Sequence, residues 1–257
     1  MDLQERIKYA QMKARHSRRL RPWYKKWWGV IVLILAGLVL IILIASVAYV
    51  ISRTHQIITG QNPAPTAAET QQYLQEINGT GNDYWMGTST PLATIVEFGD
   101  FSCPHCRDSY PVINQLAKTY PDKIKIIWRD YLINSNSIDL AMSARCAGEQ
   151  GKFWQMHDAL FANQDQLITN DAQRPAKLIA LAKSLGLNVT QFTSCLSNEK
   201  YVSQIKQNYN DGNALQIPGT PTWYVNNREF SGYIPFNQFN TLISGLIKLK
   251  IGNNAKQ

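Results

Sequence analysis

Cysteine and histidine are scarce in this sequence, which has four of each among 257 residues. A structural zinc site needs four ligands, usually supplied as two closely spaced pairs of Cys or His. Cys103 and Cys106 form one such pair, but Cys146 and Cys195 are 49 positions apart and no two histidines form a pair. The sequence also lacks the Met-rich or His-rich cluster that would favour Cu(I). We therefore predict neither a metal site nor a cofactor.

Charged residues are absent from 29–51, a run that is apolar on every face. These 23 residues, at about 1.5 Å each in a helix, span roughly the hydrocarbon core of a bilayer, and a soluble helix would need a polar face. The alternative is a cleaved signal peptide, but its apolar core would be shorter, and Ala45-Ser46-Val47-Ala48 is a poor cleavage site. We expect one uncleaved N-terminal transmembrane helix over 29–51.

Positive charge is concentrated before this helix. Residues 1–26 carry nine Lys or Arg against two acidic residues, whereas the rest of the chain holds 17 basic and 16 acidic residues. An excess of Lys and Arg on one flank predicts that this flank is cytoplasmic. We expect a basic cytoplasmic tail over 1–28, a polar linker over 52–83 and an extracytoplasmic domain over 84–257 in a single-pass protein of the cell membrane. Because topology explains the basic tail, we predict no nucleic-acid partner.

The motif Cys103-Pro104-His105-Cys106 follows the apolar, β-branched run 94–98 and precedes a helix-like segment. Two cysteines at this spacing can close a reducible disulfide. The first can lie at a helix N-terminus, where free N–H groups and the helix dipole stabilise a thiolate. Because the thiolate is the form that attacks or leaves in thiol–disulfide exchange, the motif predicts a redox-active pair.

Four cysteines allow three pairings, and disulfides persist in an exported domain. If Cys103 and Cys106 pair with each other, Cys146 and Cys195 are left to close a loop across their 49-position separation. Such a crosslink would contribute about 4 kcal/mol as an upper estimate. The alternative is two free buried thiols at these positions.

The order of secondary structure indicates the fold class. Alternation and β-branched residues predict strands over 93–99, 123–130, 222–226 and 228–232. Helical spacing predicts helices over 103–118 and 236–248 and a long helical stretch over 137–212. The resulting order is β-α-β, a helical insertion and then β-β-α, which is an α/β fold.

This order, with the Cys pair at the start of a helix, resembles the thioredoxin fold. A helical insertion between the two halves resembles the DsbA branch. Three segments carry the resemblance, which extends over residues 84–248: 97–106, leading from a strand into the Cys pair; 146–154, within the insertion; and 219–222, which reads Gly-Thr-Pro-Thr. The sequence thus resembles the membrane-anchored, DsbA-type thiol–disulfide oxidoreductases of the thioredoxin-like superfamily.

The resemblance implies roles for the residues around the Cys pair. Cys103 would be the exposed nucleophilic sulfur and Cys106 its buried partner. Pro104 and His105 form the dipeptide of strongly oxidising members, and a protonated His105 would help to stabilise the Cys103 thiolate. Glu97 matches a buried acid beneath the active-site helix that could exchange protons with Cys106. The alternative is that Glu97 points to solvent from an edge position.

The resemblance also implies a substrate-binding loop. Pro221 matches the family's cis-proline, and Thr220 would pair through its backbone with an extended substrate chain. The alternative is an ordinary trans proline. A threonine at this place also occurs in isomerase-like relatives. We expect His157 to pack within a helix and not to bind a ligand.

The predicted function is that of a membrane-tethered oxidase that forms disulfides in exported proteins through Cys103 and Cys106. Its partners would be unfolded or reduced exported proteins and a membrane reoxidant of the DsbB or vitamin K epoxide reductase type. One alternative is a disulfide isomerase or reductase that a membrane electron donor keeps reduced. The others are a copper-binding thiol chaperone and a peptide-binding domain with an inactive motif.

Overall fold

The structure is a computed structural model that describes residues 2–17, 27–59, 66–78, 83–134, 137–169 and 172–254. The chain forms two compact units, residues 1–63 and 64–257, and each is described by itself.

The first unit contains α1 (Leu3–Ser17) and α2 (Trp27–Thr59). Within α2, the 26 residues Trp27–Ser52 are long and apolar enough to cross a membrane. This confirms the predicted N-terminal apolar helix and extends it beyond 29–51 at both ends. Helix α1 lies within the predicted basic tail, and residues 18–26 of that tail lie outside the described residues.

The second unit is built on a five-stranded sheet in the order β1-β3-β2-β4-β5. The strands are β1 (Trp85–Gly87), β2 (Ala93–Gly99), β3 (Ile124–Asp130), β4 (Thr222–Val225) and β5 (Arg228–Ser231). β2 and β3 are parallel because a helix connects them, and the other neighbours are antiparallel. The predicted β-α-β and β-β-α halves of a thioredoxin-like fold are confirmed. β1 is not among the predicted strands, because three residues are too few to show an alternation of apolar and polar side chains.

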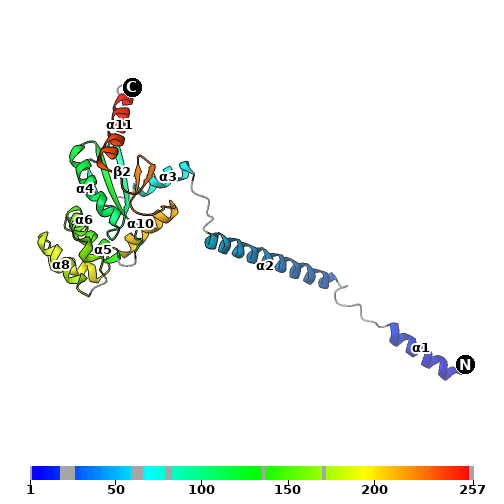
Figure 1. Ribbon diagram of the computed structural model, residues 1–257. Helices are drawn as coiled ribbons and strands as arrows, with labels where there is room; N and C mark the ends of the chain where they lie inside the picture. Colours follow the sequence, from blue (N-terminus) through cyan, green and yellow to red (C-terminus); the bar gives the residue numbers. More distant parts are fainter. Residues whose placement is uncertain are drawn as a thin grey trace. The chain divides into compact units, whose positions relative to one another are not determined.

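One face of the sheet is covered by α4 (Pro104–Thr119) and α11 (Phe236–Asn254), as Figure 1 shows. Ile113 and Leu116 of α4 and Phe239 and Ile243 of α11 share one buried cluster with Ile95 of β2. Helix α4 follows β2 after the short turn 100–103 and packs against the strand that precedes it.

The opposite face of the sheet meets α3 (Ala67–Asn78), a helix inside the predicted polar linker. Leu74 is fully buried and belongs to one cluster with Val96 of β2. The helix begins with a capping box, in which Thr66 N donates to Glu69 Oε2 and Glu69 N donates to Thr66 Oγ1. The prediction of a polar linker over the whole of 52–83 is therefore wrong where α3 forms. Residues 60–65 and 79–82 of that range lie outside the described part.

Buried charges fasten α3 to the rest of the unit. Arg129 on β3 forms ion pairs with Asp83 and with Asp211 on α10 (Val202–Ala214), the second with 2.7 Å between Nη1 and Oδ2. These three side chains are at most 8% exposed. The hydroxyl of Tyr73 on α3 donates to Oδ1 of Asp211 at 2.8 Å. The network therefore joins α3, β3 and α10.

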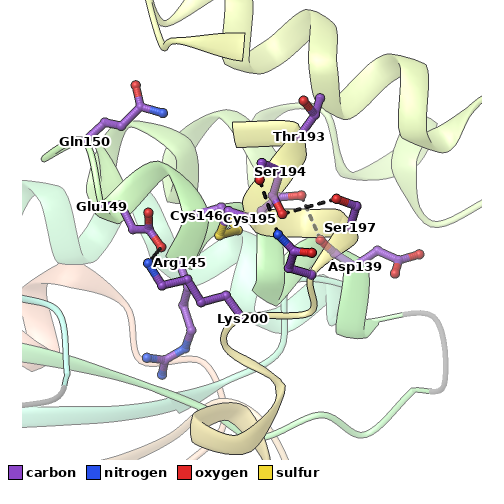
Figure 2. The surroundings of a disulfide bond; sticks show 12 residues. Asp139, Arg145, Cys146, Glu149, Gln150, Thr193, Ser194, Cys195, Ser197 and Lys200 are labelled. Atoms are coloured by element: carbon purple, nitrogen blue, oxygen red, sulfur yellow. Dashed lines mark hydrogen bonds and ion pairs between the residues drawn. A yellow bond between two sulfur atoms is a disulfide. The ribbon is translucent and has the colours of Figure 1, made fainter. Parts of the chain in front are cut away.

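The helical insertion confirms the stretch predicted over 137–212. It consists of α5 (Ile138–Gly148), α6 (Phe153–Ala162), α7 (Gln164–Leu167), α8 (Arg174–Ser184), α9 (Val189–Ser197) and α10. Cys146 on α5 and Cys195 on α9 form a disulfide, and the ion pair of Glu149 with Lys200 lies beside it (Figure 2). The alternative of two free thiols at these positions is therefore wrong. His157 on α6 is fully buried among aromatic rings and packs in the core.

Candidate active site

The Cys pair lies where β2 ends and α4 begins. Gly99 ends the strand, and a Cβ atom there would collide with the ring of Trp128. In the turn that follows, the Asp100 carboxylate accepts hydrogen bonds from Ser102 N at 2.8 Å and from Ile133 N at 2.9 Å. Cys103 is the N-cap residue of α4 and Pro104 follows it inside the helix. Proline suits this position because the first helical N–H has no acceptor within the helix.

Both cysteines are free thiols and both are buried. Cys106 faces the interior and has no exposed surface, as its predicted role requires. Cys103 is only 3% exposed, so the expectation of an exposed sulfur is wrong. The reason is the loop before β4, where the Thr220 carbonyl lies 3.2 Å from the Cys103 sulfur and accepts a hydrogen bond from it.

The two sulfurs differ in acidity. A hydrogen bond from the Cys106 thiol lowers the pKa of Cys103 most, and burial opposes this effect. The Thr220 side chain and the backbone N–H groups of Cys106 and His105 lower it further, so that the pKa of Cys103 falls from the ordinary 9.0 to about 5. Burial, followed by the interactions with Cys103 and Glu97, raises the pKa of Cys106 well above 9.0. At neutral pH the reduced pair is therefore a Cys103 thiolate and a Cys106 thiol.

His105 acts on Cys103 through its backbone. Its imidazole is 70% exposed, with Nδ1 at 4.0 Å from Oδ2 of Asp108, one turn along α4. The N–H of His105, by contrast, is among the groups that lower the pKa of Cys103. This follows from helix geometry, because the N–H groups of the second and third helical residues lie near the N-cap side chain, although the Cys103 sulfur forms no capping hydrogen bond with them.

Glu97 lies beneath the active-site helix. It is 1% exposed and shares a face of β2 with Ile95, the face that α4 and α11 cover. Its Oε2 is buried and has no hydrogen-bond partner among the described residues. Burial raises the pKa of Glu97 well above 4.5, and the negative charge of Cys103 adds to this effect. The alternative in which Glu97 points to solvent is therefore wrong.

The loop between α10 and β4 brings Thr220 and Pro221 to the Cys pair. The peptide bond between these two residues is cis, so the alternative of a trans bond is wrong. The Thr222 hydroxyl donates to the Gly219 carbonyl at 2.8 Å and closes the loop. The two residues predicted to bind substrate thus lie next to Cys103, with the Thr220 carbonyl turned towards its sulfur.

One contact of the site comes from a residue that carries no sequence signal. Gln164, the first residue of α7, donates hydrogen bonds from Nε2 to the carbonyls of Phe101 and Cys103. It lies 61 positions after Cys103, in a polar stretch with no recognisable motif. In the part of the chain that the structure describes, no group of three or more His, Cys, Asp or Glu is placed to hold a metal ion.

Comparisons with known proteins agree with this architecture. The sequence model of the thioredoxin family matches residues 79–244. The chain is similar to the solved structure of alpha-DsbA1 from Wolbachia pipientis, with a TM-score of 0.62, 20% identity, and 67% of this chain and 94% of that one covered. It is also similar to oxidised BdbD from Bacillus subtilis, with a TM-score of 0.58, 23% identity, and 65% and 93% covered. Similarity at this level shows a shared DsbA-type fold.

The curated relatives match over part of their length. Na(+)/H(+) antiporter NhaA 3 of Salinispora tropica is 33% identical over 158 residues, which are 60% of this chain and 23% of the antiporter. A Rickettsia conorii protein that bears the name protein-disulfide oxidoreductase is 29% identical over 156 residues, or 59% of this chain and 56% of that protein. The chain thus spans less than a quarter of the antiporter and little more than half of the second relative.

Proposed function

The chain belongs to the thioredoxin family, and we propose that it is a membrane-tethered thiol–disulfide oxidase that introduces disulfides into exported proteins. The observation that carries the proposal is the difference between the two sulfurs of the Cys pair. The pKa of Cys103 is lowered to about 5, whereas that of Cys106 is raised. A sulfur that is stable as a thiolate leaves readily, and stabilisation of the reduced form makes the disulfide a strong oxidant.

The proposed reaction has two exchange steps. A substrate thiolate attacks the Cys103 sulfur of the oxidised enzyme, the bond to Cys106 breaks, and Cys106 leaves as a thiolate that takes up a proton. A second substrate thiolate then attacks the substrate sulfur of the mixed disulfide, and Cys103 leaves as a thiolate. Two substrate thiols are thereby oxidised to one disulfide, and the enzyme's disulfide is reduced by two electrons.

Glu97 is the proposed proton donor to Cys106 in the first step. Its carboxyl is buried on the α4 side of β2, and burial raises its pKa, which favours the protonated form that a proton donor needs. The high pKa of Cys106 favours the transfer in this direction. Reoxidation of the enzyme would return the proton to the carboxylate.

The substrate chain is proposed to approach along the Thr220–Pro221 loop. Because Cys103 is 3% exposed and its sulfur lies 3.2 Å from the Thr220 carbonyl, a substrate sulfur that reaches it must contact this loop. In the oxidised enzyme the Cys103 sulfur has no proton to donate, so the Thr220 carbonyl would be free to accept a hydrogen bond from a backbone N–H of the extended substrate.

The membrane tether and the reoxidant complete the proposal. Helix α2 would anchor the chain, with the basic N-terminus in the cytoplasm and the catalytic unit outside. A tether raises the local concentration of the catalytic unit beside a membrane partner. That partner would be a quinone-linked protein of the DsbB or vitamin K epoxide reductase type, which accepts the two electrons of the reduced pair.

The reduction potential of the Cys103–Cys106 pair tests this function. The full chain in detergent is equilibrated with glutathione buffers, and reduced and oxidised protein are separated after alkylation, with Cys103→Ser as the control that cannot form the disulfide. A potential near the DsbA value of about −120 mV supports the oxidase. A potential near the thioredoxin value of about −270 mV contradicts it and favours a reductase or isomerase.

A further inference from the structure

A buried amide group of the insertion binds the backbone of the active-site turn. Gln164 begins α7 and is 1% exposed. Its Nε2 donates one hydrogen bond to the carbonyl of Phe101 and another to the carbonyl of Cys103, both at 2.9 Å. A single amide group thus binds the chain on both sides of Ser102, and it uses both of its N–H donors to do so.

The two carbonyls belong to the backbone that sets the direction of α4. The Cys103 carbonyl also accepts from Arg107 N at 3.1 Å, which is the first hydrogen bond of the helix. Cys103 N donates in turn to the Asp100 carbonyl at 3.0 Å. A change in the position of the Cys103 carbonyl would therefore tilt the start of α4 relative to the sulfur that the N–H groups of His105 and Cys106 face.

A second contact between the same two helices is weaker. Asp165, next to Gln164, pairs with Arg107 on the first turn of α4 at 2.5 Å between Oδ1 and Nη1. Asp165 is 83% exposed and Arg107 is 34% exposed, so solvent screens this ion pair. Of these two contacts, the buried amide of Gln164 is the one that can fix the positions of the Phe101 and Cys103 carbonyls.

The Gln164 amide is paired through its N–H groups. Oε1 of Gln164 is buried and has no hydrogen-bond partner among the residues that the structure describes. An unpaired buried carbonyl oxygen is unfavourable, and an apolar side chain of the same length would avoid it. What glutamine adds over such a side chain is the pair of N–H groups directed at the turn.

We propose that Gln164 is a positioning residue for the Cys103–Cys106 pair, which from the helical insertion holds the turn so that the first N–H groups of α4 remain directed at the Cys103 sulfur. The inference rests on the proposed function, because it concerns the same pair. It gives the insertion a part in the chemistry, since α7 then sets how well the thiolate is stabilised and hence how strongly the disulfide oxidises.

The test replaces Gln164 by methionine, which has a similar length and no N–H donor. The full chain in detergent is reduced, and the rate at which Cys103 is alkylated by iodoacetamide is followed against pH by mass spectrometry. The fraction of reduced protein at a fixed glutathione ratio is measured in parallel. For Gln164→Met we expect the pKa of Cys103 to rise by about half a unit or more, and the ratio of reduced to oxidised protein at pH 7 to fall about threefold.

Arg174→Met is the matched control. Arg174 on α8 donates from Nε to the Leu167 carbonyl at 2.7 Å and from Nη2 to the Thr169 carbonyl at 2.8 Å. It is 7% exposed and anchors the far end of α7, and neither these hydrogen bonds nor its ion pair with Asp139 involves the turn at Cys103. Arg174→Met should lower the urea midpoint and leave the pKa of Cys103 unchanged.

Two results would overturn the proposal. One is a folded Gln164→Met protein with the wild-type pKa and glutathione ratio, and the other is an equal shift in Arg174→Met. If Gln164→Met fails to fold, the uncharged Gln164→Asn decides by the same two readings, because its amide group is one methylene shorter and cannot hold both carbonyls at hydrogen-bond distance. Both readings are taken relative to the wild-type chain. A thioredoxin-like potential would therefore refute the oxidase function without removing the expected shift in the variants.

Discussion

The acidity of Cys103 depends most on Cys106, and this dependence can be tested by changing Cys106 alone. The hydrogen bond from the Cys106 thiol is the largest of the effects that lower the pKa of Cys103 from 9.0 to about 5. In Cys106→Ala this donor is lost, and in Cys106→Ser a hydroxyl can replace it. We expect the pKa of Cys103 to rise by at least one unit in Cys106→Ala and by less in Cys106→Ser.

The stability of the reduced form should follow the same pKa. Because the folded-state pKa lies below the ordinary value, the stabilising contribution of the thiolate is complete above pH 9 and is lost as the pH falls to about 5. Between these limits it changes by about 1.4 kcal/mol per pH unit. At pH 7, two units above the folded-state pKa, it amounts to about 3 kcal/mol, which raises the reduction potential by about 60 mV.

The assay is the pH dependence of alkylation at Cys103 in the reduced full chain, read by mass spectrometry so that Cys146 and Cys195 do not interfere. The wild-type rate should be half-maximal near pH 5, and the Cys106→Ala rate at a clearly higher pH. Identical profiles for the wild type, Cys106→Ala and Cys106→Ser would refute the reasoning, because the helix N-terminus alone would then account for the thiolate.

Three further predictions concern buried groups. Glu97→Gln should slow reduction of the enzyme by dithiothreitol about tenfold or more, measured by stopped-flow fluorescence, because it removes the proton donor. Since the pKa of Glu97 is raised on folding, its carboxyl is tolerated below pH 4.5 and costs stability as the pH rises. Glu97→Gln should therefore be the more stable protein at pH 7.5 by about 1–3 kcal/mol in urea unfolding, with no gain at pH 4. Arg129→Met leaves Asp83 and Asp211 without their shared cation, and it should lower the free energy of unfolding by about 3–5 kcal/mol, whereas a loss below 1 kcal/mol would contradict a buried network. Replacing both Cys146 and Cys195 by alanine opens a loop of 49 positions and should cost up to about 4 kcal/mol in the same assay. An altered pKa of Cys103 in that variant would show that the crosslink also shapes the active site.

The strands and the helix that carry the Cys pair could be predicted because their signals are local. β2 is a run of apolar and β-branched residues that ends at Gly99, and α4 starts with a proline at a position that suits it. Helix α3 could not be predicted in this way. Leu74 supplies its buried contact and Tyr73 its bond to Asp211, 138 positions away, so the segment reads as polar.

The burial of Cys103 and the contact of Gln164 could not be predicted for a related reason. The loop that covers the Cys103 sulfur comes from Thr220, 117 positions later in the chain, and Gln164 comes from 61 positions away. No spacing in the sequence relates these residues, because the sheet and the insertion bring them together. The motif predicted which atoms react, and the tertiary structure determines how those atoms are reached.

The opposite acidities of Cys103 and Cys106 follow from their places on one helix. Cys103 is the N-cap residue, so its side chain lies next to the free N–H groups of the first turn. Cys106 lies one turn further, on the side that α4 turns towards the sheet, where its thiol is fully buried and the carboxyl of Glu97 disfavours a second negative charge. If the helix began one residue later, His105 would be its first residue. The free N–H groups of the first turn would then lie further from Cys103. Pro104 allows the helix to begin directly after Cys103 at no cost in hydrogen bonds. The place of this proline therefore helps to determine the acidity of Cys103.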